Sequence, residues 1–285
     1  MGSHPTVSHD LAYVRLLQGN PQATFDLLQP WMQDAAVAAQ WPAHHREPMQ
    51  VLWLRACHRL GLLEEASAWV QQERDAGVLE AAASGVAGLI ALDLDDLPAA
   101  RMLADAALAV DAGQLEALVA RGSVALAEGD QRGARKWLQA ALKHHPHDGR
   151  TWSALGMASM MEANFLAAQQ HLQRAVQAMP EHVETWHALG WAHLMRGEGE
   201  AAASAFRSAL ELDAQDADTH GALAVVLQLS GDHAKAQHHL QEAERLDAES
   251  VTAACARAVL SGEVRDPGKL EAVMQQALSR WKPRP

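Results

Sequence analysis

Residues 149–180 read GRTWSALGMASMMEANFLAAQQHLQRAVQAMP, and the spacing within this stretch decides the fold. Counted from the first glycine, positions 4, 7, 8, 20, 24, 27 and 32 are Trp152, Leu155, Gly156, Ala168, Leu172, Ala175 and Pro180. A shift of 34 residues finds a matching set, namely Trp186, Leu189, Gly190, Ala202, Phe206 and Ala209. Self-similarity at a fixed period predicts a chain built from stacked structural repeats.

Small residues extend this register over much of the chain. Position 20 is alanine six times, at Ala66, Ala100, Ala134, Ala168, Ala202 and Ala236. Position 8 is also small in five units, at Gly88, Gly122, Gly156, Gly190 and Ala224, whereas Leu54 breaks the pattern. A small side chain at both positions lets the two helices of one repeat approach each other closely.

Glycine and proline predict where the chain turns. Position 15 is glycine in four units, at Gly61, Gly129, Gly197 and Gly231, whereas Asp95 and Ala163 occupy it in the other two. Glycine adopts positive φ without a Cβ clash, which suits a reversal between two helices. Pro146 and Pro180 are expected to end second helices, because proline lacks an amide donor.

This pattern resembles the tetratricopeptide repeat family, whose unit of 34 residues is a helix–turn–helix. The resemblance implies an all-α fold, a right-handed α-solenoid of about seven to eight antiparallel helix pairs forming a single domain over residues 1–285. The expected repeats are 47–80, 81–114, 115–148, 149–182, 183–216 and 217–250. We expect an irregular pair over 6–46 and a capping pair over 251–281, whose last helix is Lys269–Trp281.

The irregular N-terminal pair contains more residues than a repeat needs. We place the extra residues around Gln33 to Pro42, as an extended or kinked second helix with the kink at Pro30. The segment from Trp41 through Glu47 and Pro48 is then predicted to be the loop before the next unit.

Composition excludes several classes of partner. The chain has 35 acidic and 23 basic residues, a formal net charge of −12, which argues against binding to nucleic acid or to anionic membranes. The sequence shows no secretory signal and no long apolar run, so we expect a cytoplasmic protein without membrane insertion. Cys57 and Cys255 lie far apart, which favours two reduced thiols over one disulfide.

The sequence contains no convincing motif for catalysis, cofactor binding or metal binding. The phosphate-binding and nucleophile-elbow motifs are absent, so we predict no enzyme activity, no cofactor and no metal. Asp93, Asp95 and Asp96 lack the spacing of a calcium loop and are interpreted as a solvated turn. The histidine clusters 144–147 and 238–239 are interpreted as surface residues, with metal binding as the alternative, and His193 as a packed residue.

The resemblance also implies where a partner would bind. In proteins of this family the first helix of each repeat lines the inner surface, and positions 2, 5, 9, 12 and 13 contact bound peptide. The candidate residues are Arg150, Met157, Met160, Met161, His187, Trp191, Leu194, Met195 and Val225. Methionine suits a surface that accepts varied partners, but packing against the neighbouring helix is the alternative interpretation.

The predicted function is therefore a non-catalytic bacterial scaffold or adaptor that binds an apolar or amphipathic segment of a protein or peptide partner. The alternatives are a chaperone-like holder for a secretion or envelope-assembly component, and a regulatory peptide sensor. A second candidate surface is the N-terminal group Trp31, Trp41, Trp53 and Trp69. That group either caps the core or mediates self-association.

Overall fold

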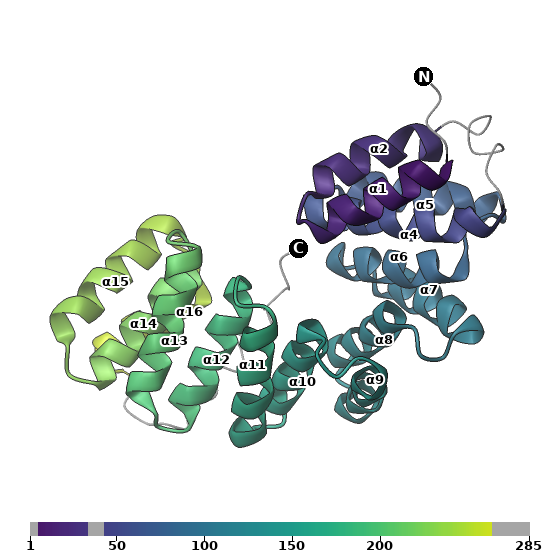
Figure 1. Cartoon of the computed structure of the whole chain (residues 1–285). Helices are drawn as coiled ribbons and strands as arrows, with labels where there is room; N and C mark the ends of the chain where they lie inside the picture. Colours follow the sequence, from purple (N-terminus) through teal and green to yellow (C-terminus); the bar gives the residue numbers. More distant parts are fainter. Residues whose placement is uncertain (1–4, 34–42, 264–285) are drawn as a thin grey trace. The chain divides into compact units, whose positions relative to one another are not determined.

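The computed structural model of the protein describes residues 5–33 and 43–263, and all regular structure in these ranges is α-helical (Figure 1). The chain divides into two compact units, Met1–Pro146 and His147–Arg284. Each unit is a series of antiparallel helix pairs, and each is described by itself here. The single continuous domain stays a prediction.

The helix boundaries follow the period of the sequence. The first unit contains α1 (Pro5–Leu17), α2 (Pro21–Gln33), α4 (Ala43–Leu60), α5 (Leu63–Asp75), α6 (Ala81–Asp93), α7 (Leu97–Val110), α8 (Leu115–Ala127) and α9 (Gln131–His144). The second contains α10 (Gly149–Met161), α11 (Phe165–Ala178), α12 (Val183–Met195), α13 (Gly199–Leu212), α14 (Ala217–Leu229), α15 (His233–Leu246) and α16 (Val251–Leu260). From α6 onward, the first helix of each pair begins 34 residues after the previous one.

Small residues form the contact between the two helices of a pair, as the steric argument requires. All six alanines at position 20 are completely buried. A Cβ atom added at Gly156 would lie 2.5 Å from Cγ of Leu172, and one at Gly190 would lie 2.5 Å from Cε1 of Phe206. In these two pairs the helices cross so closely that an added Cβ would displace the facing side chain.

The turns within the pairs share one backbone conformation. Gly129 and Gly197 both have φ of 76°, in the left-handed region. Asp95 and Ala163 occupy the same position and also have positive φ, 64° and 54°. The fold imposes this conformation even where the residue carries a Cβ atom, which costs energy.

Side-chain caps define where many helices begin. Asp130 and Asn164 accept hydrogen bonds from backbone amides three residues ahead, at the starts of α9 and α11. Asp148 and Asp216 do the same for α10 and α14. Each cap satisfies a backbone donor that has no partner within its own helix.

One expectation for the N-terminal region needs correction. Helix α4 begins at Ala43 and runs through Glu47 and Pro48, where a loop was predicted. Pro48 is the sixth residue of this helix, so it removes one backbone hydrogen bond, and the helix nevertheless continues. Helix α2 runs through Pro30 to Gln33; the kink at Pro30 stays a prediction, and residues 34–42, where most of the extra residues were placed, lie outside the described residues. Trp41 and the predicted helix Lys269–Trp281 lie outside the described residues.

A helix that crosses a membrane needs about 20 mostly apolar residues. Within residues 5–33 and 43–263, none is both long and apolar enough to cross a membrane.

Candidate functional site

All nine predicted partner-binding residues lie on α10, α12 and α14, the first helices of three consecutive pairs in the second unit. Four of them keep access to solvent. Arg150 and Met161 are exposed, at the two ends of α10, and His187 and Met195 on α12 are partly buried. The other five are buried in the core.

The predicted apolar wall is therefore corrected to a core cluster. It contains Met157, Met160, Trp191, Leu194 and Val225. Trp191 is 2% exposed and meets Phe206 edge to face, with ring centroids 5.9 Å apart. Because helices of neighbouring pairs stack side by side, positions 9 and 12 of the first helix face protein rather than solvent. These side chains stabilise the stack.

A smaller apolar surface remains at the ends of the same helices. Met161, Met195 and Leu229 are the last residues of α10, α12 and α14, and all three occupy position 13 of their repeats. Met161 is 39% exposed and Leu229 is 57% exposed, while Met195 packs partly against the core. We call these three residues the position-13 row. It places one apolar side chain per repeat at an accessible edge.

His187 is occupied by hydrogen bonds within the protein. Its Nε2 accepts from Nε1–H of Trp191 at 2.8 Å, so in the neutral ring Nδ1 carries the proton and donates to Oγ1 of Thr219 at 2.9 Å. The Thr219 hydroxyl in turn donates to Asp216. Burial lowers the pKa of His187 against the opposing effects of Asp216, Asp218 and Glu184. A neutral, satisfied histidine is a structural residue.

Similar polar contacts link the starts of successive first helices. Oγ of Ser153 on α10 lies 3.2 Å from Oγ1 of Thr185 on α12. Asp218 on α14 accepts from the hydroxyls of Ser250 and Thr252, at 2.7 and 2.8 Å. Together with the His187–Thr219 bond, these contacts form what we call the polar ladder. Our sequence interpretation missed it, although threonine recurs at position 3, at Thr151, Thr185 and Thr219.

In the first unit, polar and charged side chains at positions 2, 9, 12 and 13 of the repeats contact one another. Arg55 on α4 donates from Nε to Oε1 of Glu116 on α8 at 3.0 Å. His58 on α4 pairs with Asp93 at the end of α6. Asp93 is therefore a partner in a buried pair rather than part of a solvated turn. These contacts link α4 to α8 and to α6.

The N-terminal tryptophans that the structure describes belong to the core. Trp31, Trp53 and Trp69 are all buried. The Trp53 and Trp69 rings lie 4.9 Å apart, and Nε1–H of Trp69 donates to the carbonyl of Met32. This arrangement agrees with the hydrophobic-cap interpretation of the group.

The described histidines and the two cysteines were candidates for metal binding or reactive chemistry. Across residues 5–33 and 43–263, no group of three or more His, Cys, Asp or Glu side chains could hold a metal ion. Cys57 and Cys255 are free and buried, and burial raises the pKa of the Cys255 thiol to about 11. Thiols with raised pKa values are poor nucleophiles at neutral pH.

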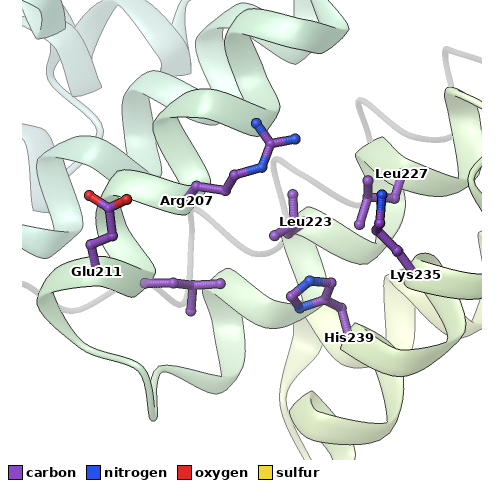
Figure 2. A pocket seen from close by; sticks show the side chains of 7 residues that line it. Arg207, Glu211, Leu223, Leu227, Lys235 and His239 are labelled. Atoms are coloured by element: carbon purple, nitrogen blue, oxygen red, sulfur yellow. The ribbon is translucent and has the colours of Figure 1, made fainter.

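The second unit also carries a pocket of about 370 Å³ formed by α13, α14 and α15 (Figure 2). Its lining residues are Arg207, Leu210, Glu211, Leu223, Leu227, Lys235 and His239. Figure 2 shows Arg207 and Lys235 on either side of Leu223, with His239 below it. Burial, together with the nearby His220, His238 and Arg207, lowers the pKa of His239 to about 4. His239 is therefore neutral at pH 7.

Comparison with known proteins agrees with the repeat pattern. Two family models, both described as tetratricopeptide repeat, match residues 115–158 and 159–224. No curated protein matches the sequence.

Solved structures share the fold at low sequence identity. The Cut9–Hcn1 assembly of the APC/C is 16% identical with a TM-score of 0.66, covering 84% of this chain and 48% of that one. A tetratricopeptide repeat protein from Parabacteroides merdae is 12% identical with a TM-score of 0.56, covering 90% and 98%. YrrB, described as a tetratricopeptide repeat protein with an unusual peptide-binding site, is 21% identical with a TM-score of 0.51, covering 66% and 97%.

Proposed function

We propose that this tetratricopeptide-repeat protein is a non-catalytic scaffold that binds a partner polypeptide along the ends of α10, α12 and α14. The observation that carries the proposal is the position-13 row, Met161, Met195 and Leu229. Met161 and Leu229 are exposed and Met195 between them is partly exposed, and an apolar patch that keeps contact with solvent can mark an interaction site. The partner would therefore be an apolar segment that crosses several repeats.

The size of the effect follows from the exposure of these residues. Fully burying a large apolar side chain contributes about 1.5–3 kcal/mol, and Met161 and Leu229 are roughly half exposed, so each has about 0.7–1.5 kcal/mol to gain. Replacing both with serine should weaken partner binding by about 1.5–3 kcal/mol, or roughly 10- to 150-fold. Both residues lie at helix ends outside the core, so the fold should be retained.

Photo-crosslinking in the native host tests the proposal. A photoreactive amino acid at position 161 or 229 should capture the same partner, and capture from position 161 should decrease when Leu229 is changed to serine. Gln177, an exposed residue of α11, is the matched control position and should not capture that partner. Adducts of equal yield at all three positions, or none from 161 and 229, would show that this edge is not a binding surface.

The identity of the captured partner separates the finer alternatives. A single assembly component bound through an apolar segment would favour a chaperone-like holder, and a short free peptide would favour a sensor. Both would use the same surface, because both require an apolar side chain to reach the position-13 row.

Self-association is a second candidate function, and a specific surface favours it. Helix α1 exposes Val7, Leu11 and Val14, which recur at helical spacing on one face, and also Tyr13 and Leu17. A second copy of α1 would cover this stripe with an identical apolar surface. Self-complementary patches of this kind suit a two-fold dimer.

A further inference from the structure

The pocket between α13 and α15 combines an apolar floor with basic sides. The floor consists of Leu210, Leu223 and Leu227, of which Leu223 and Leu227 are anchored in the core and Leu210 is partly exposed. Arg207 on α13 and Lys235 on α15 rise beside this floor (Figure 2). A ligand that fits must offer an apolar group with negative charge close to it.

The two cations are available to such a ligand. Within the described part of the chain, the Arg207 guanidinium has no ion pair and no hydrogen bond. Lys235 pairs with Asp232 in the first turn of its own helix, where its side chain is 71% exposed. An exposed pair of that kind is worth little and is readily exchanged. Glu211 is the single acidic residue of the lining, so the pocket is basic in a chain whose net charge is −12.

His239 adds a hydrogen-bond acceptor to the pocket. Its Nδ1 lies 2.9 Å from Nδ1 of His220, and Nε2 of His220 lies 3.2 Å from the carbonyl of Ala214. The carbonyl can only accept, so Nε2 of His220 carries the proton and Nδ1 of a neutral His220 accepts from His239. The remaining nitrogen of His239, Nε2, is then an acceptor. A backbone N–H group would satisfy it, whereas a small inorganic anion would not.

We propose that this pocket binds an acidic polypeptide segment in which a leucine-sized side chain lies next to carboxylates. The apolar side chain contacts Leu210, Leu223 and Leu227, the carboxylates accept from Arg207 and Lys235, and a backbone N–H donates to His239. Its charged residues lie on the second helices α13 and α15, and its lining contains no residue of the position-13 row. It gives the scaffold a second binding surface with a different chemical preference.

Fluorescence anisotropy with defined peptides tests this proposal on the full chain. The probe is a short fluorescein-labelled peptide with a central leucine between two glutamates, and its control carries glutamines instead. Charge-assisted hydrogen bonds are about twice as strong as neutral ones, so we expect the glutamine peptide to bind about tenfold more weakly. Arg207→Glu and Lys235→Glu should each weaken binding of the acidic peptide by a similar factor.

The matched control is Arg132→Glu on α9, which changes an exposed arginine of the other unit by the same charge. This variant should bind the acidic peptide as the wild type does. The serine variant of Met161 and Leu229 should also bind it normally, which separates this proposal from that for the position-13 row. Equal binding of the two peptides, no binding of the acidic peptide, or equal losses in Arg207→Glu and Arg132→Glu would overturn the proposal.

Discussion

The contact between Gly190 and Phe206 predicts that Gly190→Ala destabilises the second unit. Alanine in a helix interior is favoured over glycine by about 1 kcal/mol, so the substitution would stabilise a free helix. Here the new Cβ would meet three ring carbons of Phe206 at 2.5–2.7 Å, and Phe206 is fully buried. Overpacking of a core costs about 1–3 kcal/mol. The net loss of stability should therefore be about 0–2 kcal/mol.

Urea unfolding followed by tryptophan fluorescence measures this effect, because Trp191 packs against Phe206. The control is Gly199→Ala at the start of α13, where the new Cβ meets only Oγ of Ser230 at 3.6 Å. That variant gains helix propensity without the clash, so the two variants should differ by the cost of overpacking, about 1–3 kcal/mol. If Gly190→Ala is as stable as Gly199→Ala, the close helix crossing is wrong.

A double-mutant cycle sharpens the test. In the following repeat, the equivalent pair is Ala224 and Leu240, and both are buried. An alanine can thus face a leucine at this crossing. Gly190→Ala combined with Phe206→Leu should be less destabilised than the sum of the two single variants, since they are in contact. Strict additivity would contradict the proposed clash.

Three further predictions concern backbone strain, pH and association. Ala163→Gly should stabilise the protein by about 0.5–1 kcal/mol in urea unfolding, because left-handed φ is costly for alanine, and Gly129→Ala should do the opposite. The depressed pKa of His239 means that the unfolded chain binds more protons between about pH 6.5 and 4, so stability should fall as pH falls through that window. The urea midpoint should fall less between about pH 6.5 and pH 4 for His239→Gln than for the wild type. An equal fall in both proteins would refute the role of this histidine. Leu11→Gln with Val14→Gln should give monomers in sedimentation if α1 mediates self-association, and an unaltered dimer would exclude that face.

The repeat architecture could be predicted from the sequence because its signals are local and strictly periodic. The buried alanines at position 20 and the positive φ at Gly129 and Gly197 follow from sterics that each repeat satisfies by itself. The start of α4 could not be predicted in the same way. Pro48 indicates a helix boundary by propensity, but α4 continues through it and buries Met49 and Trp53, so packing outweighs the local preference.

The candidate site was harder to predict because exposure depends on the neighbouring repeat. Met160 and Met161 are adjacent in sequence, yet Met160 is completely buried and Met161 is 39% exposed. A single repeat does not show how far the next helix covers each position. The pocket is harder still, since Arg207, Leu223 and Lys235 come from three different helices. No spacing rule within one helix brings those three residues together.

The polar ladder affects which helices can pack against each other when the repeats of one chain are similar. Ser153 meets Thr185, His187 meets Thr219, and Asp218 meets Thr252, so each junction uses a different chemical pair. Sliding one helix along the next by a turn would leave buried hydroxyls without acceptors, which costs about 1–3 kcal/mol for each group. The apolar contacts alone would tolerate such a shift better. The different hydrogen-bonded pairs thus disfavour misaligned helices and disfavour the pairing of a repeat with the wrong neighbour during folding.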